Sequence, residues 1–360
     1  MNKPRWRDLR GIMFAGSNRI TWLEWGIGIA VALTTAMLAV TLDALFVSSW
    51  RVLVAATAVA AILLGVLLWL RSRVKQQPGT LYCVQLLDEG MRDWRTASRK
   101  EAIRRSISVR SITRWVDLEH YQENGIIHLV DSCESVSTAL EQMINSGPDD
   151  TGHTIAPNMF WPATVALGAN LPASRKLHAL ELHPDSPKKN ALLTLPQYDS
   201  GDSINLSSRD IDPCKLTINK EFEDPSHDDI AVHIALTRNS DKLTIDHINS
   251  FSVGEIYKIK PVDTKHSPLS DPNLDYCDTQ LRAQALQVAD TLISLARDNP
   301  SKQFIIFAMM PKVVALAIGW ILIQHNVKLF ERTHLMHYDQ EKGRYIPLRV
   351  RANQPDTLQT

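Results

Sequence analysis

The sequence predicts a membrane-anchored α/β protein, in which a two-helix transmembrane hairpin precedes two α/β units arranged in tandem. Near the N-terminus, two apolar runs, residues 22–42 and 52–70, are each about as long as a helix that crosses the hydrocarbon core of a bilayer. Further along, a strand–turn–helix–strand pattern occurs twice, which indicates a duplicated domain.

The hairpin occupies residues 21–75 and follows a basic N-terminal segment, residues 1–20. Three basic residues come directly after the second apolar run, whereas the short loop at Asp43–Arg51 carries one acid and one base. Because positive charge is retained on the cytoplasmic side, we expect both termini in the cytoplasm. A cleaved signal peptide is disfavoured because the first apolar run is too long and a second one follows. The alternative is a pair of buried helices in a soluble protein.

The first predicted α/β unit covers residues 80–200. Its opening run, Leu81–Leu87, is almost continuously apolar, as in a strand covered on both faces. A basic helical stretch at Met91–Ser106 presents either a solvated face or one that lies against anionic lipid. A half-buried strand at Ile107–Trp115 and a helix at Ser135–Ile144 come next. The polar segment His183–Asp212 is expected to be the connector to the second unit.

The second predicted unit covers residues 205–352. Asp278 is expected to be the N-cap of an amphipathic helix that ends near Arg297, and Pro311 to be the first residue of the next helix. Gly343 lies in the turn of a closing hairpin. The strands expected in this unit are Ile230–Thr237, Ile256–Ile259, Phe304–Ala308 and Lys328–His337.

The repeat is clearest around two prolines. Aligning Pro162 with Pro311 places PATVAL over PKVVAL, and each helix is followed by a strand-like run, the first being Leu177–Leu182. Chance similarity between two helices rich in alanine and valine is the alternative. Lys312 adds a positive charge where free N–H groups are expected to point outward, a place that favours an anion. A third membrane span at Phe304–Ile323 is disfavoured by this central lysine.

Composition and motifs exclude several functions. The formal net charge is zero, so we expect no DNA or RNA polymer as a partner. The four cysteines are scattered and are expected to be reduced thiols. The sequence contains no GxGxxG, GxxxxGK[ST], GxSxG or HExxH motif, so a dinucleotide cofactor, NTP hydrolysis and catalysis in general are disfavoured. His334 and His337 would face opposite sides of a strand, so we expect no metal site.

The segment FAMMPKVVALAIG, with the ending HLMHYDQEKGRYIPL, resembles the carboxyl-terminal part of a SAVED domain. The resemblance covers about Leu81–Arg351 and implies two fused CARF-like Rossmann units. With the hairpin, the chain resembles the transmembrane SAVED effectors of bacterial CBASS anti-phage systems. The resemblance implies that the domain binds a cyclic oligonucleotide made by a CD-NTase, forms a homo-oligomer and disrupts the lipid of the inner membrane, which kills the infected cell. No nuclease, protease or NADase module is present, unlike in many fused members.

In such a domain we expect a cyclic di- or trinucleotide, and no cofactor, in the crevice at the carboxyl ends of the strands. The acids Asp88 and Glu89 would repel a phosphate there. The candidate residues are Lys312 and Arg238 for phosphates, Trp161, Phe160 or Tyr338 for stacking on a base, Asn158 or Asn239 for its edge, and Met310 and Pro311 at the turn. Each has an alternative role on the surface or in packing. Two alternative functions are a ring-nuclease-type enzyme that cleaves the cyclic oligonucleotide and a membrane-anchored scaffold that binds a protein.

Overall fold

The computed structural model describes residues 79–147, 152–172, 177–196, 215–237, 251–262, 278–325, 328–339 and 342–357, together with Gly65 and Ile248. The chain divides into two units, and the unit formed by Leu81–Glu101, Val109–Pro148 and Gly152–Thr360 contains both sheets described below except Gly79, Thr80 and Ser108. No helix in the described ranges is both long and apolar enough for a membrane span. Apart from Gly65, the predicted hairpin lies outside the described residues.

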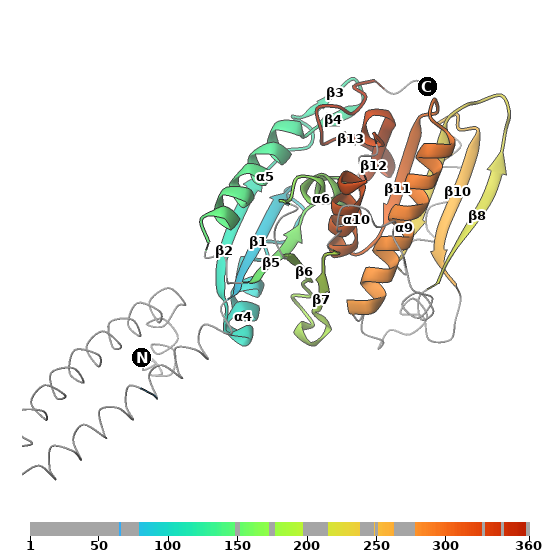
Figure 1. Cartoon of the computed structure of the whole chain (residues 1–360). Helices are drawn as coiled ribbons and strands as arrows, with labels where there is room; N and C mark the ends of the chain where they lie inside the picture. The colour runs from blue at the N-terminus through green and yellow to red at the C-terminus, as the bar shows by residue number, and fades with distance from the viewer. Residues whose placement is uncertain are drawn as a thin grey trace, which may run out of the picture. The chain divides into compact units, whose positions relative to one another are not determined.

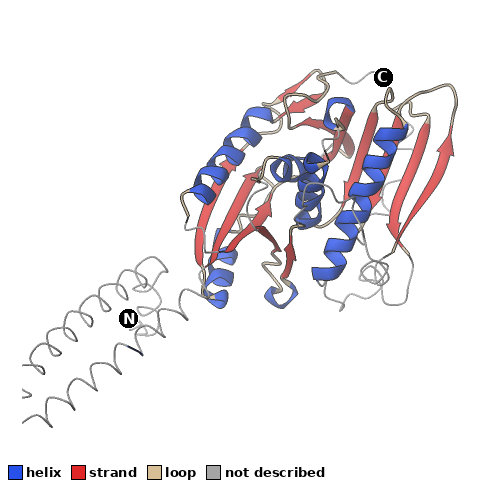
Figure 2. Cartoon of the chain, viewed as in Figure 1, coloured by secondary structure: helices blue, strands red, loops and turns tan. Residues whose placement is uncertain are grey.

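Two β-sheets with helices against them make up the fold (Figures 1 and 2). The smaller sheet has the strand order β2-β1-β5-β6-β7, and the larger has the order β3-β4-β13-β12-β11-β9-β10-β8. The strands are β1 Gly79–Leu87, β2 Ser108–Trp115, β3 Gln122–Glu123, β4 Ile126–His128, β5 Gly152–Asn158, β6 Leu177–Glu181, β7 Ala191–Thr194, β8 Leu216–Glu223, β9 Ile230–Ala235, β10 Glu255–Pro261, β11 Phe304–Met309, β12 Thr333–Asp339 and β13 Arg344–Arg349. The helices are α4 Arg95–Arg105, α5 Val130–Asn145, α6 Trp161–Ala169, α9 Asp278–Asp298 and α10 Lys312–Gln324, with short 3-10 turns at Pro187–Lys189 and Phe330–Arg332.

The α/β fold predicted from the apolar patterns is confirmed in the described residues. Leu81–Leu87 in β1 is buried throughout, and so is β9. Both strands lie inside their sheets, with neighbours on each side, so an unbroken apolar run suits them. Strand β2 forms where it was predicted, but it lies at the edge of its sheet, and its Trp115 is 54% exposed.

The repeat is visible in the topology. The order β2-β1-β5-β6-β7 corresponds to β10-β9-β11-β12-β13, and in both sets the third and fourth strands are parallel and the last two antiparallel. Phe160 caps α6 with φ −57° and ψ 143°, and Pro311 caps α10 with φ −57° and ψ 144°. Phe160 therefore corresponds to Pro311.

This correspondence corrects two details of the sequence prediction. Pro311 is the N-cap of α10 rather than its first helical residue, whereas Pro162 lies inside the first turn of α6. Aligning the two prolines was therefore wrong by two residues. A proline fits both positions, because neither needs an N–H group for the helix ladder, so proline identity does not determine the register.

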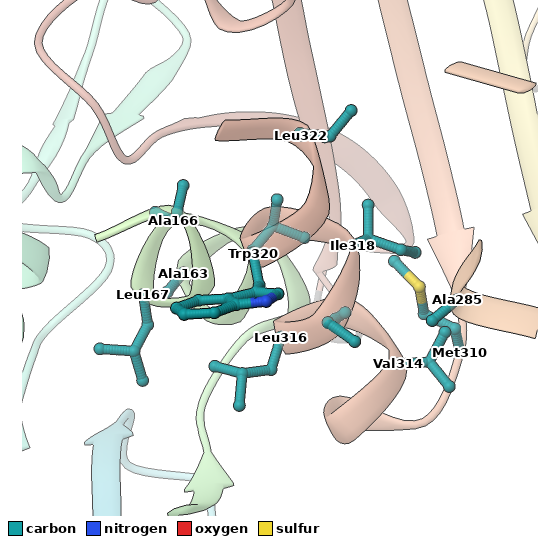
Figure 3. Packing of buried hydrophobic residues seen from close by; sticks show 14 of the residues in the cluster. Ala163, Ala166, Leu167, Ala285, Met310, Val314, Leu316, Ile318, Trp320 and Leu322 are labelled. Carbon is teal, nitrogen blue, oxygen red and sulfur yellow. The ribbon is translucent and has the colours of Figure 1, made fainter. Parts of the chain in front are cut away.

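Helices α6 and α10 pack against each other at glycines and lie between the two sheets (Figure 1). A Cβ atom on Gly168 would collide with the carbonyl oxygen of Leu316, and one on Gly319 would collide with that of Val165. The two backbones are therefore in direct contact, through equivalent positions on each helix. In Figure 3, Trp320 of α10 lies beside α6, whereas Met310 lies near Ala285 of α9.

Other element boundaries differ from the prediction. Helix α4 begins at Arg95 rather than Met91, because the Asp93 carboxylate accepts the Arg95 N–H at 2.8 Å and caps the helix. Helix α9 spans Asp278–Asp298, and the residues directly before it lie outside the described ranges, so the N-cap role of Asp278 stays a prediction. Strand β12 begins at Thr333, because the three residues before it form a 3-10 turn.

The segment predicted as a connector between the units contains structure. Within His183–Asp212, strand β7 joins the smaller sheet antiparallel to β6. The Trp320 indole N–H donates to the carbonyl of Pro196 at 2.7 Å, which holds Pro196 against α10. Strand β4 belongs by sequence to the first predicted unit, yet it pairs with β13 in the larger sheet.

Candidate functional site

Each of the two central helices begins against a strand of the other repeat. At the start of α10, the Val313 N–H donates to Glu181 Oε2 of β6 at 2.9 Å. At the start of α6, the Trp161 indole N–H donates to the carbonyl of Met336 in β12 at 3.0 Å, and the Phe160 ring lies 4.9 Å from the His337 ring. The N-termini of the two helices are thus docked reciprocally.

Strand register shows that the two docking positions are equivalent. His153 of β5 pairs with Leu177 of β6, and Phe304 of β11 pairs with Thr333 of β12. Four residues further along each outer strand come Glu181 and His337. Equivalent backbone positions therefore carry a carboxylate at one helix start and an imidazole at the other.

We call the first of these places the polar end and define it by Gln85, Trp94, Asn158, Glu181 and Lys312. The Lys312 ammonium donates to Asn158 Oδ1 at 2.6 Å and lies 4.0 Å from the centre of the Trp94 ring. Asn158 is buried and donates through Nδ2 to Gln85 Oε1 at 2.9 Å. The polar end therefore brings together an ammonium, two amides and an indole.

Gln85 connects the polar end to the neighbouring strand and loop by hydrogen bonds. Its side chain is fully buried in β1, and its Nε2 donates to Asp93 Oδ1 and to Thr113 Oγ1, both at 2.9 Å. Its Oε1 also accepts the Trp94 N–H at 2.7 Å. These bonds satisfy a buried amide that would otherwise be costly, and they hold the loop between β1 and α4 in place.

The electrostatics of the polar end are those of buried charge. Burial lowers the pKa of Lys312 to about 8, while the nearby Glu181 carboxylate acts to raise it. Burial raises the pKa of Glu181, against the effects of the Val313 N–H and the Lys312 charge. The expectation of outward-pointing N–H groups at the start of α10 is therefore wrong for Val313, because Glu181 of the same chain accepts that N–H.

We call the second place the aromatic end and define it by Phe160, Trp161, Met310, His337 and Tyr338. Phe160 is buried, whereas Tyr338 is 39% exposed, and its ring lies 5.0 Å from the ring of Tyr345 at a tilt of 52°. Burial lowers the pKa of His337, and the carboxylates of Asp339 and Asp88 oppose that shift. Asp88, which was expected to repel a phosphate, thus acts electrostatically on His337 at this end.

A small apolar cavity lies behind the aromatic end. Trp161 and Met310 form part of its wall, and further walls come from Leu292 of α9, Ile318 of α10 and Leu335 of β12. Figure 3 shows Met310 and Ile318 on the α9 side of α10. The cavity therefore lies where the start of α6 meets α9, α10 and β12.

Residues 136–348, more than half of the chain, match the family model described as "SMODS-associated and fused to various effectors sensor domain", SAVED. The chain belongs to the SAVED family. The family predicted from the sequence is thereby confirmed. The match begins within α5, so the SAVED model does not cover Gln85 or Trp94 of the polar end. No curated protein sequence matches the chain.

Three solved structures named as Cap4 SAVED/CARF-domain containing receptors are similar to the chain at low TM-scores. The Acinetobacter baumannii receptor with 2′3′3′-cAAA has 13% identity and a TM-score of 0.43, over 82% of this chain and 56% of that one. The same receptor with 3′3′3′-cAAA has 12% identity and a TM-score of 0.42, over 80% of this chain and 55% of that one. The Moraxella osloensis receptor has 15% identity and a TM-score of 0.33, over 59% and 40%. The chain thus spans little more than half the length of the Acinetobacter baumannii receptor. The family assignment rests on the family model alone.

Within this SAVED domain, most of the predicted site residues gather at the two ends. Asn158 and Lys312 lie in direct contact at the polar end. Pro311 caps the helix beside them. The candidates Phe160, Trp161, Met310 and Tyr338 belong to the aromatic end, and the candidates Arg238 and Asn239 lie outside the described residues.

Sequence reasoning missed three members of the polar end: Gln85, Trp94 and Glu181. Two of them left a signal, because Gln85 interrupts the apolar run LYCVQLL and Glu181 interrupts LHALEL. A polar side chain inside a buried strand needs a partner, so each was a candidate for a specific contact. Among the described residues, no group of three or more His, Cys, Asp or Glu side chains is arranged to hold a metal ion.

Proposed function

We propose that this chain is a non-catalytic membrane effector of bacterial anti-phage defence that senses a cyclic oligonucleotide. The SAVED domain binds a cyclic di- or trinucleotide supplied by a CD-NTase, and binding drives assembly of several copies. The N-terminal hairpin spans the inner membrane with both termini in the cytoplasm, and the assembled hairpins disrupt that membrane.

Membership of a sensor-domain family is the observation that carries this proposal. The chemistry of the two ends supports it. Amide groups such as that of Asn158 recognise base edges, and aromatic faces such as those of Trp94 and Tyr338 stack on bases. At the polar end, the Lys312 ammonium is hydrogen-bonded to the Asn158 amide and contacts the Trp94 indole ring.

The reciprocal docking suggests how binding is transmitted. A ligand at the polar end contacts the start of α10, which rests on β6 through Glu181. Helix α10 in turn packs on α6 at Gly168 and Gly319, and α6 rests on β12. A ligand that shifts either helix start therefore shifts both repeats together, which suits a sensor that changes how copies associate.

Binding without turnover is part of the proposal. Glu181, the acid whose charge acts on the pKa of Lys312, accepts a backbone N–H and lies buried, so its contacts serve to hold a helix. Trp94 and Asn158 have no acid–base chemistry of their own near neutral pH. The ligand should therefore be recovered unchanged.

The test is a thermal-shift panel on the full-length chain in detergent. Cyclic di-, tri- and tetranucleotides are added, including 2′3′3′-cAAA and 3′3′3′-cAAA, and any ligand that binds is followed by sizing and by chromatography of the recovered ligand. At a hundred times its dissociation constant, a ligand adds about 2.7 kcal/mol of stability. We expect one clear shift, a larger assembled species and intact ligand.

The membrane step has its own measurement. The chain is reconstituted in dye-filled vesicles, and the binding ligand is added from outside. We expect dye release only with that ligand. If no ligand in the panel shifts the melting temperature, the proposed sensor function is wrong. Cleavage of the ligand would favour the ring-nuclease alternative. Binding without dye release would contradict membrane disruption but not ligand sensing.

A further inference from the structure

An exposed ion pair crosses the polar end. Arg92 lies in the loop between β1 and α4, and Asp185 follows β6; Arg92 Nη1 lies 2.8 Å from Asp185 Oδ1. In the sheet order, β5 lies between β1 and β6. The pair therefore bridges two loops that flank the carboxyl end of β5, where Asn158 is located.

The main chain of Arg92 is fixed, while its side chain is exposed. Its carbonyl accepts the Asn158 Nδ2–H at 2.8 Å, so the residue is anchored beside the amide of the polar end. The Arg92 and Asp185 side chains are 66% and 80% exposed. An ion pair this exposed contributes little to stability and exchanges partners readily.

Lys312 is poorly suited to hold a phosphate, in spite of its charge. Its ammonium is already bonded to Asn158 and lies over Trp94, and burial disfavours its charged form. Arg92 presents an exposed guanidinium, and its carbonyl is bonded to the same amide. A guanidinium also matches the two oxygens of a phosphodiester with paired hydrogen bonds.

We propose that Arg92 binds a phosphodiester group of the cyclic oligonucleotide, and that the phosphate replaces Asp185 as its partner. This inference rests on the proposed function and adds the residue that recognises the ligand's negative charge. Asp185 is then a resident competitor, which occupies the guanidinium until an anion of the right geometry enters. The loop between β1 and α4 lies outside the residues matched by the family model.

The experiment measures the affinity of the full-length chain in detergent for 2′3′3′-cAAA, 3′3′3′-cAAA and the other members of the panel. Arg92→Gln removes the guanidinium and should weaken binding by about ten- to a hundredfold, as expected for hydrogen bonds to a charged group. Asp185→Asn removes the competitor and should tighten binding by about two- to fivefold. The two substitutions break the same ion pair, yet they should act in opposite directions.

Matched controls remove the same charges away from the Arg92–Asp185 pair. Arg99→Gln acts on the exposed face of α4, and Glu141→Gln acts on the exposed face of α5. Each control should change the affinity less than twofold. The melting temperature of the ligand-free chain should not change in either Arg92→Gln or Asp185→Asn, because the pair they break is exposed.

The inference is overturned if Arg92→Gln binds the ligand as well as Arg99→Gln does, or if Asp185→Asn binds no more tightly than Glu141→Gln. Equal weakening by both members of the pair would also overturn it, because that result identifies a structural ion pair. If the wild-type chain binds no cyclic oligonucleotide, the proposed function fails and this inference fails with it.

Discussion

The polar end and the aromatic end occupy equivalent places in the two repeats, yet they carry different chemistry. Lys312 and Trp161 are both the first residue of a central helix, and Glu181 and His337 are both the strand residues that meet the helix start. The backbone of the repeat has been kept while its side chains have diverged. The polar end is held by hydrogen bonds to charged groups, and the aromatic end by one indole hydrogen bond and a ring contact.

The strongest test of this comparison addresses what the two repeats share. Gly168→Ala and Gly319→Ala each place a methyl group against a backbone carbonyl of the other helix. Each should destabilise the chain by about 3 kcal/mol, the upper end for overpacking, or more. Thermal unfolding measures both. Gly152→Ala is the control because a Cβ there meets nothing within 4 Å. Clearly unequal losses would show that the helix contact is also asymmetric.

The second test removes the amide at the polar end. Asn158→Leu removes one hydrogen-bond partner from the Lys312 ammonium and one from the Gln85 side-chain oxygen. We therefore expect the free energy of unfolding, measured in urea, to fall by about 2–3 kcal/mol. Met309 occupies the corresponding position in the other repeat, and Met309→Leu should cost less than about 1.5 kcal/mol. Similar losses at the two positions would contradict the contrast between the ends.

A third test uses pH. The pKa of Lys312 is lowered from 10.5 to about 8 in the folded chain, so the unfolded chain binds more protons between these values. Stability should therefore rise with pH through this window, by about 2 kcal/mol at pH 10 relative to Lys312→Met. Urea unfolding of both chains from pH 7 to pH 10 measures the difference. Parallel pH profiles would show that the Lys312 ammonium is not desolvated.

The smallest effect is expected at the aromatic end. Trp161→Phe keeps an aromatic ring but removes the indole donor to Met336, so we expect a loss of about 1 kcal/mol in thermal unfolding. The same change at Trp115, which is 54% exposed, should have no measurable effect. If Trp161→Phe lowered the free energy of unfolding as much as Asn158→Leu does, the single indole hydrogen bond would stabilise the aromatic end as strongly as the charged network stabilises the polar end.

The sequence predicted local features well. Apolar runs located β1 and β9, and the apolar face of α9, including Leu281, Val288 and Leu292, is buried as its spacing indicated. These features depend on neighbours in the chain, which a hydrophobic period records directly. The contact between Asn158 and Lys312 was also accessible, because both residues lie at strand–helix turns of a repeat.

The remaining features depend on residues far apart in the chain. Glu181 caps a helix that begins more than a hundred residues later, and no local pattern encodes that contact. Strand β7 has four residues within a polar segment, too few for alternation to be recognised. The two-residue error in the repeat alignment arose because Pro162 and Pro311 fill different positions that proline tolerates equally.

The pairing of β4 with β13 has a consequence for the newly made chain. Ile127 lies in register with Leu348, and the Leu129 N–H donates to the carbonyl of Arg349 at 2.8 Å. Translation adds about 5–20 residues per second, so roughly 10–45 s separate the synthesis of these partners. The larger sheet stays incomplete for all of that time. The larger sheet can therefore be completed only after β13 has been synthesised and has left the ribosome.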